Sequence, residues 1–165
     1  MKSIIAVLIL TTLVGFNQST NTISDEALLS LKDAEKIFGE SGKKTEGITE
    51  TKDNLKIYKT TYRADANDPK SGREVNLYFM YEEYKYDSAA KRVYNEIKTS
   101  NQTHQGFQVW KGIGDEAYYH SDGANFYFVL ARKGPRMIRM KLNKVTSKSN
   151  ETEFKKISER IVKGL

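Results

Sequence analysis

The chain has 165 residues, with 27 Lys and Arg against 21 Asp and Glu, and 38% of its residues are hydrophobic. This composition is typical of one small globular domain and excludes long disordered, collagen-like and coiled-coil chains. The absence of cysteine and the presence of only two histidines exclude thiol nucleophiles, iron–sulfur clusters and Cys-ligated zinc. The sequence therefore predicts neither a metal site nor a cofactor.

The N-terminus has the pattern of a secretory signal. Lys2 supplies a positive charge, and an uncharged apolar run covers residues 4–14. A membrane-spanning helix needs about 20 apolar residues, so this run favours a cleaved signal over a retained anchor or a buried helix. We expect residues 1–19 to be the signal and residues 20–165 to form a single domain that is exported to the periplasm or secreted.

The first half of the predicted domain contains one helix and one hairpin. Ser30 or Asp25 is the candidate N-cap for a helix that ends at Gly39 or Gly42. Residues 55–62 and 75–81 each alternate in the two-residue period of a β-strand, and a turn rich in Asp, Gly and Pro separates them. These two segments are therefore predicted to pair as a β-hairpin.

The second half predicts further strands between two amphipathic helices. A helix opens at Asp87 or Ser88, strands are expected over residues 117–120, 126–132 and 136–145, and a final helix is expected over residues 153–162. Asp122-Gly123 is the strongest short hairpin signal in the chain and predicts that the first two of these strands pair. We expect an α+β fold with a mostly antiparallel sheet of about five to six strands flanked by helices, in the order α-β-β-α-β-β-β-(β)-α.

Tyrosines on the predicted hairpin are the first candidate binding residues. Tyr78 and Met80 share one face of their strand, and Tyr58 and Tyr62 share a face of the neighbouring strand. Together they could form an aromatic platform for a ligand. The alternative is a face covered by a helix, with the phenol groups reaching water at its rim.

A basic hairpin is the second candidate. Residues 131–165 hold 11 Lys and Arg against 3 Asp and Glu, and the alternation places Arg139 and Lys141 on one face of their strand, with Arg132 and Arg136 nearby. Such a patch suits an anionic partner, namely an acidic glycan, a lipid headgroup or an acidic protein surface, and the alternative is a solvated face. Nucleic acid is not favoured, because no nucleic-acid-binding motif is present.

The candidate catalytic groups are His120, Asp115 and Glu116, which would serve a secreted hydrolase. Nothing in their spacing brings them together, and the sequence has no nucleophile elbow, phosphate loop or zinc-protease motif. We therefore expect that the protein is not an enzyme.

Three segments carry a resemblance to a known architecture: residues 28–42, residues 112–119 (GIGDEAYY) and residues 125–140. Over residues 24–165 the chain resembles small secreted bacterial domains of PsbP-like architecture, including extracellular domains of mycobacterial lipoproteins and sensor kinases. The resemblance implies an antiparallel sheet flanked by helices in a non-enzymatic ligand-binding or accessory domain. The chain differs from the lipoproteins in having no lipobox Cys.

The resulting expectation is an exported binding or accessory domain of the cell envelope that recognises a protein partner or a small ligand. The alternatives are a secreted hydrolase that uses His120 with Asp115 and Glu116, and a self-associating structural protein of the envelope.

Overall fold

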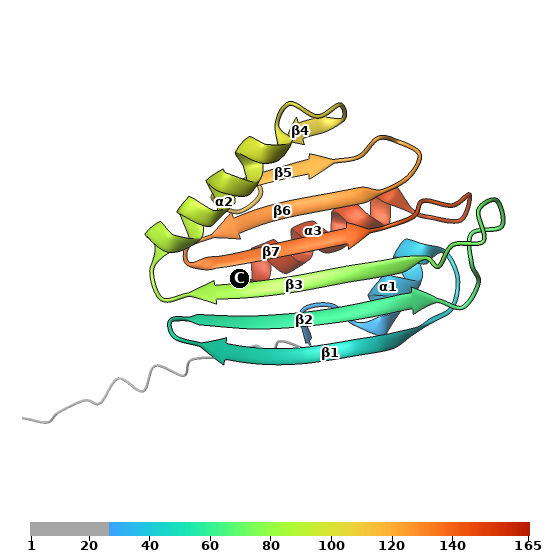
Figure 1. The fold of residues 1–165 in the computed structure, drawn as a ribbon, viewed down its shortest axis with the longest axis horizontal. Helices are drawn as coiled ribbons and strands as arrows, with labels where there is room; N and C mark the ends of the chain where they lie inside the picture. Colours follow the sequence, from blue (N-terminus) through green and yellow to red (C-terminus); the bar gives the residue numbers. More distant parts are fainter. Residues whose placement is uncertain (1–26) are drawn as a thin grey trace, which may run out of the picture.

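The computed structural model describes residues 27–165, and the expected signal over residues 1–19 lies outside this described part. Residues 27–165 contain three helices and seven strands, shown in Figure 1: α1 (Leu31–Phe38), β1 (Gly42–Lys52), β2 (Leu55–Ala64), β3 (Asn76–Tyr84), α2 (Asp87–Asn101), β4 (Phe107–Val109), β5 (Glu116–His120), β6 (Tyr127–Lys133), β7 (Arg136–Leu142) and α3 (Glu151–Gly164).

One antiparallel sheet contains all seven strands, in the spatial order β1-β2-β3-β7-β6-β5-β4. The expected hairpins β2–β3, β5–β6 and β6–β7 are present. Pairing of β3 with β7 joins the two halves of the sheet, although these strands are far apart in the sequence. The expected α+β fold with an antiparallel sheet and flanking helices is therefore confirmed.

The expected strand count of five to six is wrong, because the sheet has a further strand before the first expected one. This strand, β1, has a mostly polar sequence in which we predicted no strand. Only its first residue, Gly42, is partly buried, and the other ten residues are exposed. Neither face of β1 is buried, so its sequence lacks the apolar alternation by which strands are recognised. Four strands follow α2, which agrees with the longer version of the expected order.

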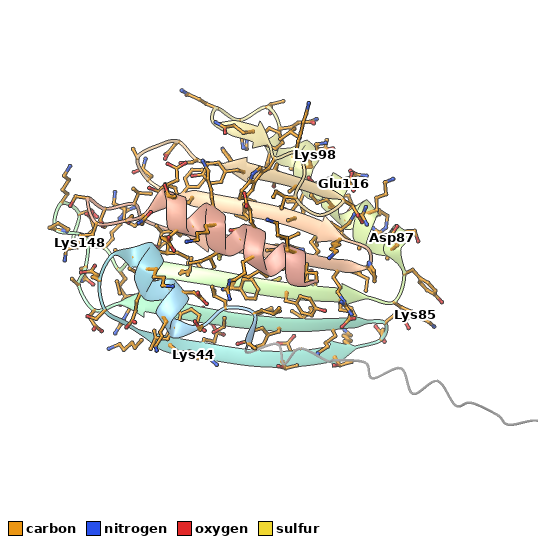
Figure 2. The ribbon with its side chains drawn as sticks, turned by 180° about the vertical axis from the view of Figure 1, so that it is seen from behind. Lys44, Lys85, Asp87, Lys98, Glu116 and Lys148 are labelled. Atoms are coloured by element: carbon orange, nitrogen blue, oxygen red, sulfur yellow. The ribbon has the colours of Figure 1, made fainter. Side chains whose placement is uncertain are left out.

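The main hydrophobic core lies between the sheet and the pair of helices α1 and α3, which cover one face together (Figure 2). Alternate residues of β2, β3, β5, β6 and β7 point into this core, among them Tyr58, Phe79 and Met140. The Tyr62 hydroxyl donates a 2.6 Å hydrogen bond to the Leu29 carbonyl and so ties the entry of α1 to β2. Burial of this face explains why these strands have a clear two-residue period.

The opposite face is covered by α2 alone, which crosses β5, β6 and β7 near one end (Figure 1). Tyr94 of α2 packs edge-on against Tyr118, with ring centroids 6.2 Å apart, and the buried residues Leu130 and Met137 complete a second, smaller core. None of the described helices lies over β1 and β2 on this side in Figure 1. This incomplete cover leaves part of the sheet accessible.

An ordered turn joins β5 to β6 and confirms the hairpin expected at Asp122-Gly123. The Asp122 carboxylate accepts hydrogen bonds from the backbone amides of Ala124 and Asn125, at 3.1 and 2.7 Å, and from the Asn125 side chain at 2.7 Å. Hydrogen bonds from the Asn125 side chain and from backbone amides stabilise the ionised carboxylate and lower the pKa of Asp122 to about 2.

The turn predicts a pH-dependent contribution to stability. Because the folded pKa of Asp122 lies below the ordinary Asp value of about 3.9, ionised Asp122 stabilises the fold above pH 4 and loses this effect as the pH falls toward 2. The difference in unfolding free energy between the natural chain and Asp122→Asn should therefore shrink between pH 5 and pH 3 in urea titrations. A difference that stays constant over this range would contradict the assignment.

Candidate functional site

Cross-strand pairing aligns side chains into two rows on the face that carries α2. The first row runs Glu46, Thr61, Tyr78, Lys141, Phe128 and His120. The second row runs Ile48, Lys59, Met80, Arg139, Leu130 and Tyr118. Directly opposed residues of an antiparallel sheet lie on the same face, so each row crosses the sheet from β1 to β5.

The β1 ends of both rows are left uncovered by α2. We call this surface the open corner and define it as Glu46, Ile48, Lys59, Thr61, Tyr78, Met80, Arg139 and Lys141. All but Ile48 line a shallow hollow of about 200 Å³. Tyr78 and Ile48 remain 43% and 41% exposed.

A second hollow on the same side continues from the open corner toward the start of α2. Its volume is about 460 Å³, and its apolar lining comes from Leu55, Ile57, Tyr84 and Tyr86. Ile57 pairs with Glu82 on the neighbouring strand and with Glu50 on β1, so it forms the next row beside the open corner. The accessible part of the sheet thus carries two neighbouring hollows, each lined by both apolar and charged side chains.

The cations of the open corner differ in how far their charge is balanced. Arg139 makes two hydrogen bonds to the Glu82 carboxylate, at 2.8 and 2.9 Å, and Glu82 is buried. Lys59 lies 3.9 Å from Glu50. Lys141 is exposed and stacks over the Phe126 ring at 5.6 Å, with no carboxylate within ion-pair distance in the described chain. Lys141 is therefore the cation of this surface that can best accept an anion.

Glu82 is hydrogen-bonded to one lining residue of each hollow, Tyr84 and Arg139. The Tyr84 hydroxyl donates a 3.0 Å hydrogen bond to the Glu82 carboxylate. Burial of Tyr84, together with the neighbouring negative charge of Glu82, raises the pKa of this phenol well above its ordinary value. Tyr84 stays neutral at physiological pH and serves Glu82 as a donor, so Arg139 and Tyr84 together satisfy the buried carboxylate.

The structure places the four residues of the expected aromatic platform on two faces of the sheet: Tyr58 and Tyr62 are buried in the main core, whereas Tyr78 and Met80 lie in the open corner. Tyr78 lies in the open corner, whereas Tyr58 points to the opposite face and is only 1% exposed, against Phe79 in the main core. Paired strands place Tyr58 opposite Tyr81, and Tyr78 opposite Thr61. Tyr58 is therefore a core residue, and the aromatic platform does not form as expected.

The basic hairpin is divided in a similar way. Its expected alternation is present, since Arg139 and Lys141 share the open face while the apolar residues between them are buried. Arg136 instead lies at the end of the hairpin, where it hydrogen-bonds Glu83 at 3.2 Å and the Leu165 carbonyl at 2.5 Å. Only Arg139 and Lys141 of the four expected basic residues thus reach the open corner.

Arg132 has a structural position. Its side chain is 5% exposed and bonds Asp87 of α2, Glu116 at 3.0 Å and the Gly134 carbonyl at 2.8 Å, with Asp115 3.4 Å away. Figure 2 shows Asp87 and Glu116 at the same end of the sheet. The guanidinium joins α2, the loop before β5 and the β6–β7 turn, and its burial leaves no room for a ligand.

The groups of the hydrolase alternative do not converge in the described chain. Glu116 and His120 are the two ends of the five-residue strand β5, which separates them by about 13 Å at 3.3 Å per residue. The His120 imidazole is buried, lies 3.1 Å from the Gln105 carbonyl and packs edge-on against Phe126. Asp115 accepts a 2.7 Å hydrogen bond from the Gly134 amide. Each group has a local structural partner.

Several residues of the open corner were missed in the sequence. Glu46 and Ile48 belong to β1, the strand that was not predicted from the sequence. Lys59 and Thr61 become candidate binding residues only when their pairing with residues of β1 and β3 is known. The one available signal was an isolated Ile48 in a polar stretch rich in Thr, a residue with high β-propensity.

Comparisons of the chain with protein-family models, with curated proteins and with solved structures found no match. The resemblance to PsbP-like domains therefore stays an expectation. Within residues 27–165, none of the helices is both long and apolar enough to cross a membrane.

The position of Arg132 predicts a large effect on stability. Arg132→Met leaves three carboxylates without their shared cation, and we expect the unfolding free energy to fall by about 2 kcal/mol. This value is below that for a fully buried pair, because the carboxylates of Asp87 and Asp115 are 59% and 49% exposed. Urea denaturation measures the change.

Arg92→Met is the matched control, because Arg92 is 69% exposed and pairs only with Glu96 one turn away. It should change the unfolding free energy by less than about 0.5 kcal/mol. Equal effects of the two substitutions would show that the Arg132 cluster does not stabilise the fold.

Proposed function

We propose that the protein is an exported, non-enzymatic binding domain of the cell envelope and that its ligand binds at the open corner. Export rests on the signal pattern of residues 1–19. One observation carries the binding site: Tyr78 and Ile48 stay exposed beside Lys141 and Lys59 on the part of the sheet that α2 does not cover. Exposed apolar groups bordered by charge are typical of binding sites.

The ligand that fits this surface is a small organic anion with an apolar part. Tyr78, Met80 and Ile48 offer the apolar contact, and the Lys141 ammonium offers the charge. Arg139 contributes less to anion binding, since Glu82 already balances its charge at 2.8 Å. Glu46 stands at the β1 end of the Lys141 row, so an anionic group is attracted to the β7 side and the apolar part extends toward β1.

Rigidity of the surface supports a binding role. Six of the eight residues of the open corner lie on the central strands β2, β3 and β7, whose backbones are hydrogen-bonded on both sides, and only Glu46 and Ile48 lie on the edge strand β1. The ion pair with Glu82 fixes the side chain of Arg139 beside Met80. A preformed surface of this kind loses little conformational entropy when a ligand binds.

Binding of an aromatic sulfonate dye to the natively folded protein tests the proposal. We expect 8-anilinonaphthalene-1-sulfonate to bind, and Lys141→Glu and Tyr78→Ser each to weaken binding about tenfold, through loss of the charge and of the apolar contact respectively. Fluorescence titration at low ionic strength gives the dissociation constants, and decanoate should compete with the dye.

Two matched variants control for nonspecific effects. Lys156→Glu makes the same charge change at a 74% exposed position on α3, and Tyr86→Ser removes a 57% exposed tyrosine at the start of α2. Neither should change the affinity by more than about twofold. Equal losses in Lys156→Glu and Lys141→Glu, or a loss confined to Tyr86→Ser, would move the ligand away from the open corner.

A further inference from the structure

The two edges of the sheet differ greatly in length. β4 forms one edge with three residues, whereas β1 forms the other with eleven and is exposed along almost its whole length. β1 contains no proline, and no described element lies alongside its outer edge in Figure 1. An edge strand of this length presents a row of backbone donors and acceptors to a further strand.

A bulge divides β1 into two parts. The register with β2 shifts between Lys44 and Glu46, which leaves Thr45 as the extra residue. From Glu46 to Lys52 the pairing with residues 55–61 is regular. These seven residues are the part of the edge that can pair with another strand without interruption.

We infer that a second copy of this chain pairs with this edge, antiparallel, through residues 46–52 and about a two-fold axis at Thr49. In this register Glu46 lies opposite Lys52 of the second copy, and Lys52 lies opposite its Glu46. Thr49 faces its own equivalent, and Ile48 faces Glu50. Two symmetric ion pairs therefore close the ends of the paired segment.

Charge selects this register over its neighbours. A shift by one residue would place side chains of opposite faces together, because the strand period is two. Moving the axis to Ile48 puts Glu46 opposite Glu50, and moving it to residue 50 puts Glu50 opposite its own equivalent. Like charges directly opposite each other are destabilising. The axis at Thr49 avoids such contacts and keeps all seven residues paired.

Self-pairing is favoured over strand addition by an unrelated protein, because lysines near both ends of β1 repel partners without matching acidic groups. In the paired state the sheets of the two copies continue into each other. Glu46 and Ile48 belong both to β1 and to the open corner, so the two open corners would adjoin across the two-fold axis. This self-association is independent of the proposed ligand.

Charge reversal tests the register directly. We expect the protein, as it accumulates in an exporting bacterial host, to form a weak dimer at concentrations up to about 1 mM, weaker at high salt. Glu46→Lys alone and Lys52→Glu alone should each weaken the dimer about tenfold, because each brings two pairs of like charges together. Sedimentation equilibrium without any ligand gives the association constants.

Two restorations distinguish this register from general charge effects. The double variant Glu46→Lys/Lys52→Glu should dimerise like the natural chain, and an equimolar mixture of the two single variants should form a heterodimer. Thermal unfolding checks that every variant is folded. A monomer at all concentrations would overturn the proposal, and so would a dimer that the single variants leave intact or that the double variant fails to restore.

Discussion

The number and length of the helices determine how much of each face of the sheet is covered. Two helices cover one face, and α2 alone serves the other. Its 15 residues make a rod about 22 Å long, whereas seven strands extend over about 29 Å at the usual spacing. One helix that crosses β5 to β7 cannot reach β1 and β2. The open corner is therefore a direct consequence of the number and length of the helices.

The basic hairpin shows how one charged segment serves two purposes. Arg132 is surrounded by carboxylates from α2 and from the start of β5, and Arg136 fastens the end of the hairpin to Glu83. These cations hold elements together, and their charges are balanced. Lys141 rests on an aromatic ring and has no carboxylate within ion-pair distance in residues 27–165. Net charge in a sequence therefore overstates the charge that a ligand can reach.

Elements with at least one buried face could be predicted from the sequence, and β1, which has none, could not. The strands β2, β3, β6 and β7 and all three helices show the expected periods, because the core selects apolar residues at every second or every third to fourth position. The relative placement of faces was only partly accessible. The alternation correctly placed Arg139 with Lys141, but the separation of Tyr58 from Tyr78 depends on the β2–β3 register, which pairs Tyr58 with Tyr81.

The strand that the sequence concealed is also the one with the most unused bonding capacity. β1 has no buried face to impose a period, so the constraints on its sequence come from the edge. Its ends carry lysines, Glu46, Ile48 and Glu50 occupy every second position with Gly47 and Thr49 between them, and its regular part begins with an acidic residue and ends with a basic one. A strand required only to avoid aggregation needs charge but no such order. The opposite charges at equal distances from Thr49 satisfy a two-fold axis, and this symmetry explains the order of residues along an otherwise featureless polar strand.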